Sequence, residues 1–275
     1  MEAWVLTHAE DLQFELFFGL LAVFGLAEAL APRRPGPMRR RARWLTNFAL
    51  TALNIVVMGL LPLTFFDAAV WAANQRFGVG HWIALPAAAT ILGTLLVRGF
   101  ISFFTHYLAH RVPALWRLHR VHHLDTELDV STTVRFHPAE FALNLAVGVP
   151  IVALWGLSPW VLMFYEILDA GVTLFSHANV RVPVALDRVL RYVIVTPDLH
   201  RVHHSAWQTE TDSNFGAVFP IWDLVFGTFR TATREPQATM TLGLEEVRDG
   251  RENRLGWLLR SPLLRQLRGD EGGES

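Results

Sequence analysis

Long apolar segments separated by short polar ones dominate the N-terminal part of this chain. Leu12 to Ala31 forms a first apolar stretch, about the length that is needed to cross a bilayer. A second region runs from Trp44 to Ala73 and contains Pro62, which predicts a kink or a pair of shorter helices. A third extends from Trp82 to Phe104. The pattern therefore predicts three long membrane spans.

Two shorter apolar segments follow, from Ala139 to Trp155 and from Pro159 to Phe175, with the turn-forming Gly156-Leu-Ser-Pro159 between them. Each has about 17 residues, the lower limit for a span, so we expect a short helical hairpin that either crosses the membrane or enters it shallowly. In both cases the chain returns to the side that it left. The tail from Arg230 is charged, and we expect it to be partly helical and peripheral, with disorder over residues 269–275.

The composition supports a membrane protein. The chain is 52% hydrophobic and has only 18% charged residues, whereas soluble domains carry about 25%. The formal net charge is −1 and no basic domain is present, so the expected partner is the lipid bilayer and not nucleic acid. Cysteine is absent, which excludes disulfides, thiolate ligands and cysteine nucleophiles together.

An arginine-rich segment between the first two spans sets the predicted orientation. Pro32 to Arg43 contains six arginines in twelve residues, and such a segment between two spans is typical of a cytoplasmic loop. The second span then leads away from the cytoplasm and the third leads back, so the residues after Phe104 are expected on the cytoplasmic side. All 24 basic residues are arginine, which indicates a high-GC, bacterial genome. We therefore expect an integral protein of the bacterial inner membrane.

Histidines carry the strongest chemical signal. Ten of the twelve fall between His106 and His204, and eight of these form three clusters. The clusters are His106-Tyr-Leu-Ala-His110, His119-Arg-Val-His122-His123 and His200-Arg-Val-His203-His204. Residues three and four apart share a helix face, so each cluster directs two or three imidazoles the same way. Imidazole binds iron, zinc, copper and nickel, and eight rings are too many for one ion, so the clusters predict two metals.

The residues around the clusters predict where the helices that carry them begin and end. Proline disfavours helix in the residue before it, so the first histidine helix should stop near Val112 and a new one should begin at Pro113. Thr196 is a predicted N-cap of the last cluster's helix, with Pro197 in the first turn. Asp198 either helps to cap this helix or accepts a hydrogen bond from a ligand imidazole.

Carboxylates near the spans have open interpretations. Glu166 and Asp169 lie three residues apart inside an apolar segment. They are either functional or hydrogen-bonded to an inward-facing histidine or arginine, with Arg98 and Arg135 as possible counter-charges. Three further acidic residues lie in a predicted loop, where we expect most of them to be solvated: Asp125, Glu127 and Asp129.

The order H-x-x-x-H, H-x-x-H-H, H-x-x-H-H around hydrophobic spans resembles the fatty acid hydroxylase superfamily, also called the sterol desaturase family. The similarity covers roughly Val97 to Phe229, about half of the chain. Further matching motifs are Leu115-Trp-Arg-x-His119, Arg135-Phe-His-Pro138, Ser176-His-Ala-Asn179, Pro197-Asp-Leu-His-Arg-Val-His-His-Ser205, Asn214-Phe-Gly216, Trp222-Asp223 and Phe226-Gly-Thr228.

This resemblance implies a fold and a chemistry. The expected fold is all-α: a polytopic membrane helical bundle of three long spans plus a short helical hairpin, capped by a cytosolic histidine-rich helical metal-binding region. It implies three parts: an N-terminal transmembrane region (1–96), a catalytic region (97–230) and a charged C-terminal tail (231–275). Family members carry a di-iron centre and use dioxygen to hydroxylate or desaturate lipid chains, sterols or related molecules. Soluble di-iron proteins use Glu-x-x-His motifs, which this chain lacks.

The resemblance also implies residue roles. His177, in the Ser-His-Ala-Asn motif, joins the three clusters as a metal ligand. The predicted ligands are His106, His110, His119, His122, His123, His177, His200, His203 and His204. Five residues are predicted to support these ligands: His137, Asn179, Asp198, Asn214 and Asp223. His137 either contacts a metal or caps the start of the fourth apolar segment.

Several alternatives stay open at this point. Hydroxylation, desaturation and cleavage of ether lipids, which related members perform, are all compatible with the sequence. A non-redox di-zinc membrane protein is a further alternative, because zinc also binds imidazole but takes four ligands. A bis-histidine haem protein needs isolated histidines within the spans, and a metal transporter needs ligands near mid-membrane.

No nucleotide fingerprint and no fused haem or flavin domain is visible, so the electrons must come from a separate donor, a ferredoxin or small cytochrome with its reductase. Four arginines either form a basic docking face for an acidic donor or contact lipid headgroups: Arg111, Arg117, Arg120 and Arg201.

Overall fold

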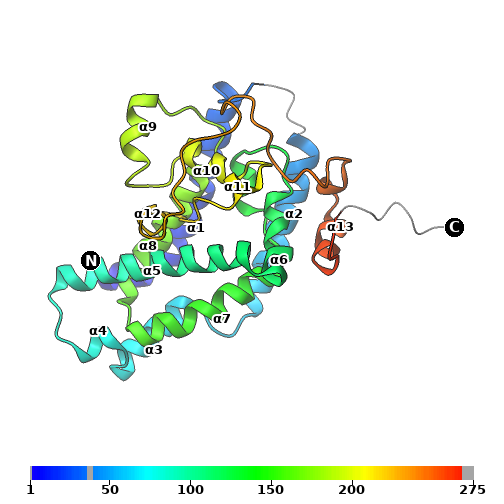
Figure 1. Cartoon of the computed structure of the whole chain (residues 1–275). Helices are drawn as coiled ribbons and strands as arrows, with labels where there is room; N and C mark the ends of the chain where they lie inside the picture. The colour runs from blue at the N-terminus through cyan, green and yellow to red at the C-terminus, as the bar shows by residue number, and fades with distance from the viewer. Residues whose placement is uncertain (1, 36–39, 268–275) are drawn as a thin grey trace.

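The computed structural model is helical and describes residues 2–35 and 40–267 (Figure 1). The long helices are α1 (Glu2–Leu30), α2 (Arg40–Leu60), α5 (Ala87–Arg111), α7 (Pro138–Trp155) and α8 (Pro159–His177). The shorter helices are α3 (Phe65–Gln75), α4 (Val79–Trp82), α6 (Pro113–His123), α9 (Val184–Leu190), α10 (Pro197–His203), α11 (Gln208–Thr211), α12 (Ile221–Phe226) and α13 (Leu255–Arg260). Single 3₁₀ turns occupy Val130–Val134, Arg251–Asn253 and Ser261–Leu263. Within the described ranges, extended pairing is limited to two isolated bridges, so the all-α fold class is confirmed.

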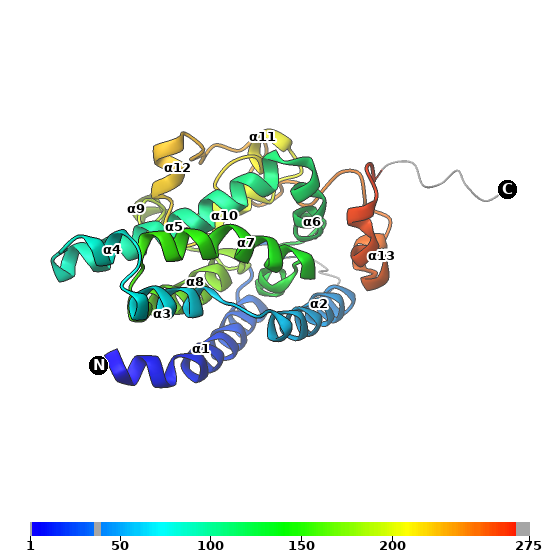
Figure 2. The same cartoon turned by 90° about the horizontal axis from the view of Figure 1, so that it is seen from below.

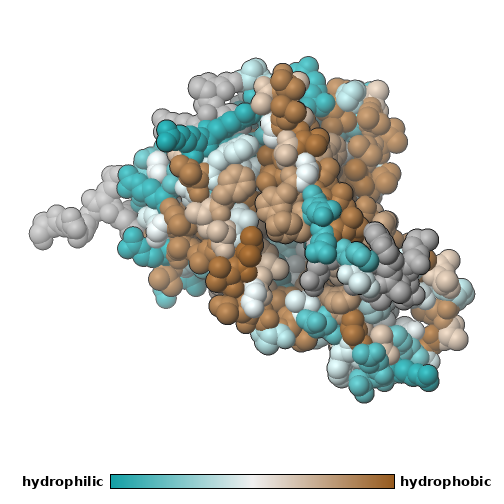
Figure 3. Space-filling view, turned by 180° about the vertical axis from the view of Figure 1, so that it is seen from behind, coloured by the Kyte–Doolittle hydropathy of each residue, from teal (hydrophilic) through white to brown (hydrophobic). Residues whose placement is uncertain are grey.

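Four segments are long and apolar enough to cross a membrane: Asp11–Leu30, Arg40–Trp82, Ala87–Arg111 and Pro138–Trp155. The first three correspond to the predicted long spans, and the fourth is α7, the first half of the predicted hairpin. The second half, α8, packs along α1. Large apolar side chains of α1 and α2 are exposed, including those of Leu26 and Ile55. The molecule accordingly shows broad apolar areas on its surface (Figure 3).

The second apolar region is a pair of helices, as Pro62 predicted. α2 ends at Leu60 and α3 begins after Thr64, whose hydroxyl accepts a hydrogen bond from the Asp67 backbone N–H at 3.1 Å. The Asp67 carboxylate in turn accepts from the Thr64 backbone N–H at 2.9 Å, which completes a capping box. This cap lets the chain turn back, so that α3 packs against α7 and α8.

The helices that carry the histidines converge at one end of the bundle. α5 ends at Arg111 and α6 begins at Pro113, with Val112 in an extended conformation, as the proline predicted. α10 is capped by Thr196, whose hydroxyl accepts from the Leu199 N–H at 3.3 Å. The arginine-rich segment lies at the same end, because Arg33 Nε pairs with an Asp198 oxygen at 3.3 Å. The arginine-rich segment and the histidine helices thus meet at one end of the bundle, whereas the number of membrane crossings stays a prediction.

A buried ion cluster ties α2 to the loop after α6. Arg43 Nε lies 2.6 Å from Asp125 Oδ1, and Arg43 Nη1 lies 2.7 Å from Asp129 Oδ2. Burial alone would raise the pKa of Asp125, but the charges of Arg43 and Arg135 and the hydrogen bonds from Arg43 and Thr132 lower it to about 2. The expectation of a solvated loop is therefore wrong for Asp125 and Asp129, because their partner comes from a distant helix.

A second ion pair lies between α5 and α8. Arg98 donates to both oxygens of Glu166, from Nε at 2.6 Å and from Nη2 at 3.1 Å. Of the two predicted counter-charges, Arg98 therefore has this role. Arg135 has another: its Nη1 donates to Asn47 Oδ1 at 2.8 Å, and its Nη2 donates to the Glu252 carbonyl.

The C-terminal segment packs against the histidine helices. Val247 and Leu258 share a buried apolar cluster with Leu50 of α2 and with Val121 and Leu124, which lie in α6 and at its end. The guanidinium of Arg120 also donates to the Ser261 and Leu264 carbonyls. Both views place α13 beside α2 and α6 (Figure 2). This part of the chain is thus not peripheral, and residues 269–275, expected to be disordered, lie outside the described ranges.

Replacing Arg43 tests the buried ion cluster. Arg43→Ala leaves two buried carboxylates without their partner, a loss of about 3–5 kcal/mol, so we expect the unfolding temperature in detergent to fall by about 10 °C. Differential scanning fluorimetry measures this shift. Arg41→Ala is the matched control, because Arg41 is an exposed arginine on the same helix. Equal shifts in the two variants would contradict a stabilising role of the cluster.

Candidate metal centre

Nine histidine side chains meet in two neighbouring groups. The first group contains His106, His110, His119, His123 and His203, and the second contains His122, His177, His200 and His204. Within each group, one ring nitrogen per histidine lies within 4.8 Å of all the others. These are the same nine residues that the sequence and the resemblance singled out as metal ligands, so the structure brings the whole predicted set together.

The two H-x-x-H-H motifs divide their rings in opposite ways. In α6, His119 and His123 share a helix face and join the first group, whereas His122 joins the second. In the α10 motif, His203 joins the first group, and the pair His200 and His204 joins the second. Each group therefore receives rings from both motifs, and the two groups lie side by side.

Hydrogen bonds orient the rings of the first group. His106 Nδ1 donates to the Phe215 carbonyl at 2.8 Å, and His203 Nδ1 donates to the Ser213 carbonyl at 2.7 Å. His119 Nδ1 donates to Glu140 Oε1 at 2.7 Å. Because a carbonyl can only accept, the contacts of His106 and His203 place the proton on Nδ1 and leave the Nε2 lone pair free, whereas His119 Nε2 lies 3.2 Å from His123 Nε2.

The free nitrogens point inward. Nε2 of His106, His110 and His203 is buried without a hydrogen-bond partner in the described parts of the chain. Buried polar atoms are rarely left unsatisfied. Three unpartnered acceptors around one point are therefore the expected arrangement of a cation site, in which the bound ion takes up all three lone pairs.

In the second group, the Nε2 atoms of neighbouring rings lie within hydrogen-bond distance of one another. His177 Nε2 lies 3.2 Å from His122 Nε2 and 3.0 Å from His200 Nε2, which in turn lies 3.1 Å from His204 Nε2. His177 Nδ1 donates to the Thr173 carbonyl at 2.8 Å, so its Nε2 can only accept. Protons cannot be placed in all of these Nε2–Nε2 contacts at once, so some lone pairs face one another without a proton between them. A cation among them satisfies all four.

Four of the clustered rings are held in the neutral form that binds metals. Burial, followed by the charge of neighbouring imidazoles, lowers the pKa of His122, His123 and His200 well below the usual value for histidine. The same causes lower the pKa of His203 to about 3. Neutral imidazole is the metal-ligating form, so the donor set fits iron, zinc, copper or nickel.

Two of the predicted supporting residues hold the loop that orients the rings. Asp223 accepts hydrogen bonds from the backbone N–H groups of Phe215 and Gly216 at 2.7 and 2.8 Å. Asn214, in the left-handed conformation with φ of 54°, donates to the carbonyls of Leu199 and Arg230. This loop carries the carbonyls that accept from His106 and His203, so Asn214 and Asp223 act on the histidines through the backbone.

The other three predicted supporting residues hold different parts of the fold. His137 caps α7, accepting from the Ala139 N–H at 3.2 Å, and lies outside both histidine groups. The Asn179 side chain pairs with the backbone of Arg34, and Asp198 pairs with Arg33. Neither of the two roles proposed for Asp198 is seen, because Thr196 caps the helix and an arginine occupies the carboxylate.

Sequence reasoning missed Glu140 and Asp212, which accept from His119 Nδ1 and from His110 Nδ1, the latter at 3.3 Å. The sequence signal for Glu140 is its position in the first turn of an apolar helix, because a carboxylate that is buried there needs a hydrogen-bond partner. The four-arginine docking face does not form as predicted: Arg120 is buried against backbone carbonyls and Arg201 is fully buried, whereas Arg111 is exposed.

Comparison with known proteins gives these features a context. The family model for fatty acid hydroxylase matches residues 91–228. The chain is 28% identical to an ornithine lipid hydroxylase of Rhizobium tropici, over 82% of this chain and 68% of that protein. It is 30% identical to a cholesterol 25-hydroxylase-like protein of Danio rerio, over 74% and 83%, and 27% identical to human alkylglycerol monooxygenase, over 66% and 40%.

The chain thus spans about two thirds of the first of these relatives and less than half of alkylglycerol monooxygenase. No solved structure matches it. The family match covers half of the chain and contains all nine clustered histidines. The chain belongs to the fatty acid hydroxylase family.

Proposed function

We propose that this chain is a membrane-bound di-iron oxygenase that hydroxylates or desaturates a lipid or sterol-like substrate, using dioxygen and electrons from a separate donor. The observation that carries the proposal is the pair of all-imidazole groups, five rings beside four. A group of four suits zinc, but five rings exceed the four ligands that zinc takes. Relatives named as hydroxylases and monooxygenases support iron and redox chemistry.

The chemistry requires two electrons and two protons for each dioxygen. Hydroxylation follows R–H + O2 + 2e− + 2H+ → R–OH + H2O, and desaturation removes two hydrogen atoms from the substrate and yields two waters. Two iron ions held by the histidine groups would supply the reduction of dioxygen and the oxidation of the C–H bond. The protein's contribution is to hold the ligands, orient the substrate and exclude water.

Aromatic rings close off the centre from solvent. The Phe136 ring stacks on His122 with ring centroids 4.6 Å apart, and Trp116 and Phe215 pack against His110 at 4.9 and 5.1 Å. A dry site strengthens the hydrogen bonds that orient the imidazoles. These rings therefore keep the ligand geometry fixed and limit the access of water to the reaction.

A small apolar cavity supports substrate approach from the membrane. It has a volume of about 40 Å³ and lies between α5, α6 and α7, where Leu108, Leu115 and Leu143 line it together with Glu140. Because Glu140 also contacts His119, this cavity reaches the residues that hold the first histidine group. α5 and α7 are both candidate spans, so an apolar chain can approach between them.

The proposal extends to the rest of the protein. Residues 1–96 form the N-terminal membrane region, residues 97–230 the catalytic region and residues 231–275 the C-terminal tail. We place the protein in the bacterial inner membrane with the metal centre on the cytoplasmic side. The contact of Arg33, from the arginine-rich segment, with Asp198 supports this orientation. A ferredoxin or small cytochrome with its reductase supplies the electrons.

Metal analysis tests the di-iron centre. Protein purified from iron-replete cells is expected to contain two irons per chain, and the Mössbauer spectrum of iron-57 protein should show an antiferromagnetically coupled pair. His177→Ala, which removes a ring from the second group, should lose roughly half of the iron. His137→Ala is the matched control and should keep it, because His137 lies outside both groups. Stoichiometric zinc or haem in the wild-type protein would contradict the proposal.

Glu140 tests how the ligands are held. Glu140→Ala removes the acceptor for His119 Nδ1, so the iron affinity is expected to fall about 10- to 100-fold. Iron retention during titration with a chelator measures this. Glu140→Gln keeps an oxygen that can accept the same hydrogen bond, so it should lie between wild type and alanine. If Glu140→Gln and Glu140→Ala lower the iron affinity equally, the hydrogen bond from His119 does not account for the effect.

The reaction type is tested with ¹⁸O2. Membranes that contain the protein and a reducing system are supplied with candidate lipids and sterols, and the products are analysed by mass spectrometry. One ¹⁸O in a new hydroxyl group establishes hydroxylation, whereas a loss of two hydrogens without label establishes desaturation. An aldehyde from an alkylglycerol establishes ether cleavage, for which the alkylglycerol monooxygenase relatives are the precedent. Unlabelled hydrolysis products alone would favour the zinc alternative.

A further inference from the structure

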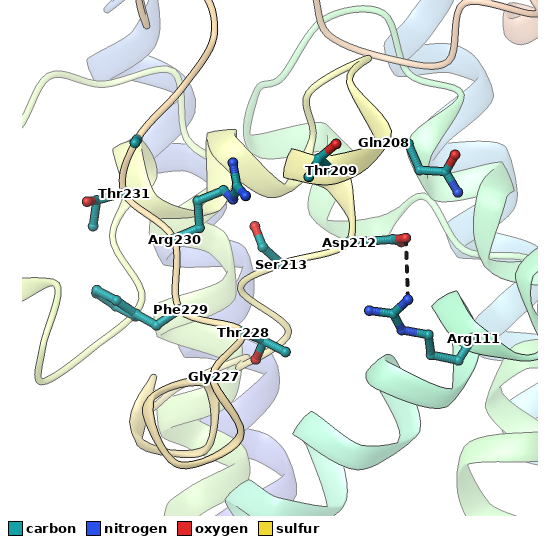
Figure 4. A pocket seen from close by; sticks show the side chains of 11 residues that line it. Arg111, Gln208, Thr209, Asp212, Ser213, Gly227, Thr228, Phe229, Arg230 and Thr231 are labelled. Atoms are coloured by element: carbon teal, nitrogen blue, oxygen red, sulfur yellow. Dashed lines mark ion pairs between the residues drawn. The ribbon is translucent and has the colours of Figure 1, made fainter.

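A polar cavity beside the metal centre has no role in the proposed chemistry. Its volume is about 800 Å³, and it lies between the end of α5, α11 and the segment that follows α12 (Figure 4). Small-molecule sites have volumes of about 300–1,000 Å³, so this hollow suits a ligand or headgroup better than a protein surface. The residues that matter for recognition are Arg111, Gln208, Thr209, Asp212, Arg230 and Thr231.

The charge of the cavity favours an anion. Arg111 and Arg230 reach into the hollow from opposite sides (Figure 4). Arg111 Nη1 lies 3.8 Å from Asp212 Oδ2, a loose pair, and the other oxygen of Asp212 accepts from His110. The guanidinium of Arg230 has no ion pair with any residue that the structure describes. Two guanidinium groups and one carboxylate leave a net positive charge.

The neutral side chains of the cavity strengthen this preference. Gln208, Thr209 and Thr231 add amide and hydroxyl donors to the lining. Arginine binds phosphate in a bidentate manner through its planar, forked donors. A phosphate between Arg111 and Arg230 would meet a guanidinium on each side, with hydroxyl donors close by.

The helix that leads into the cavity is apolar on its outside. α12 exposes Ile221, Leu224, Val225 and Phe226, whereas its acidic residue, Asp223, is buried. Val225 alone is 63% exposed. A short helix with four exposed large apolar side chains and no exposed charge is poorly suited to water. We therefore expect the outer face of α12 to lie in an apolar environment.

Contacts with α5 place this helix at the level of a membrane span. Trp222 Nε1 donates to the Leu96 carbonyl at 3.1 Å, and the Phe226 ring stacks on Phe103 with centroids 5.3 Å apart. Leu96 and Phe103 lie in the middle of α5, which is a candidate span. Arg111 lies eight residues beyond Phe103, about 12 Å further along the helix axis. The apolar face of α12 thus lies beside the middle of α5, and Arg111 lies beyond it at the end of α5.

The apolar surface continues beyond α12. Tyr192 and Val193, which follow α9, are both exposed, and the Tyr192 ring stacks on Phe229 of the cavity lining with centroids 5.2 Å apart. The cavity is therefore bordered by apolar side chains on the side of α9 and α12. Free phosphate would leave this apolar border uncovered, whereas a lipid can place its headgroup in the polar cavity and its chains against the border.

We propose that this cavity binds the phosphate-bearing headgroup of an anionic membrane lipid, with the lipid chains lying along α12. The headgroup phosphate pairs with Arg111 and Arg230, and the chains cover the exposed face of α12 at the level of mid-α5. Asp212 joins the cavity wall to His110, so the headgroup lies next to the histidine centre. The proposal does not depend on the identity of the metal or on the reaction.

Binding of a short-chain lipid tests the headgroup site. Isothermal titration calorimetry follows the binding of dihexanoylphosphatidylglycerol, below its micelle concentration, to the protein in neutral detergent. Arg230→Gln is expected to weaken binding at least about tenfold, because a charge-assisted contact to phosphate is lost. Arg111→Gln should do the same, and the double variant should abolish measurable binding. Arg254→Gln, an exposed arginine outside the cavity, is the matched control and should bind like wild type.

The arms of this experiment separate the sources of the phosphate. Inorganic phosphate is expected to bind far more weakly than the lipid, because it lacks the chains that contact α12. Equal affinity for the two would overturn the lipid proposal in favour of a free anion. Unchanged lipid affinity in Arg230→Gln would overturn the site itself. If the two arginine variants lose binding to an acidic ferredoxin but keep the lipid affinity of wild type, the arginines dock a protein and the lipid proposal is overturned.

The position of α12 is tested separately. The chain has no cysteine, so Val225→Cys gives a single site for a bimane label in vesicles of phosphatidylglycerol and phosphatidylcholine. Brominated lipids should quench this label as strongly as one at Leu92→Cys on the exposed face of α5. A label at Arg254→Cys should not be quenched. If Val225 resembles Arg254 instead, the lipid chains do not reach α12 and the proposal fails.

Discussion

The nine histidine rings are packed so tightly that each buried ring nitrogen needs a partner, and this constraint shapes the centre. One nitrogen of several rings is satisfied from outside, by the carbonyls of Thr173, Ser213 and Phe215 and by the carboxylates of Glu140 and Asp212. The other nitrogen faces the interior of its group. No protein donor reaches Nε2 of His106, His110 or His203 within the described residues, and a bound cation would supply the missing partner.

The outer partners are themselves held in place by the fold. Asp223 fixes the backbone of Phe215 and Gly216, and Asn214 fixes the same loop to the first turn of α10 through the Leu199 carbonyl. One loop therefore orients rings from α5 and from α10 at the same time. Glu140 reaches the third helix, α6, from the first turn of α7. The ligand geometry thus depends on contacts between segments that are far apart in the chain.

The local features of this architecture could be predicted from the sequence. Proline positions marked the break between α5 and α6. The prediction that each cluster directs its rings the same way is wrong for the two H-x-x-H-H motifs, because only their residues four apart join the same group and the third ring joins the other. Thr196 was recognisable as a cap because capping involves neighbouring residues. What could not be predicted are the partners that meet only after folding. Asp125 looked like part of a solvated loop, because its partner Arg43 precedes it by 82 residues.

The same limit explains Asp198 and Glu140. Asp198 sits where a helix cap or a ligand partner is common, but folding brings Arg33 of the arginine-rich segment against it. Glu140 gave little signal, because a carboxylate in a first helical turn is ordinary and His119 approaches it from another helix. Spacing in the sequence thus identified the clustered histidines, while the residues that orient their rings are brought in by long-range packing.

The contacts of α6 and the following loop with the C-terminal segment limit the order in which the protein can fold. Arg120 of α6 is anchored by the carbonyls of Ser261 and Leu264, and Arg135, after the following loop, is anchored by that of Glu252. During synthesis, all the clustered histidines leave the ribosome before these anchors exist. The contacts that anchor α6 can therefore form only after the residues of both histidine groups have been synthesised.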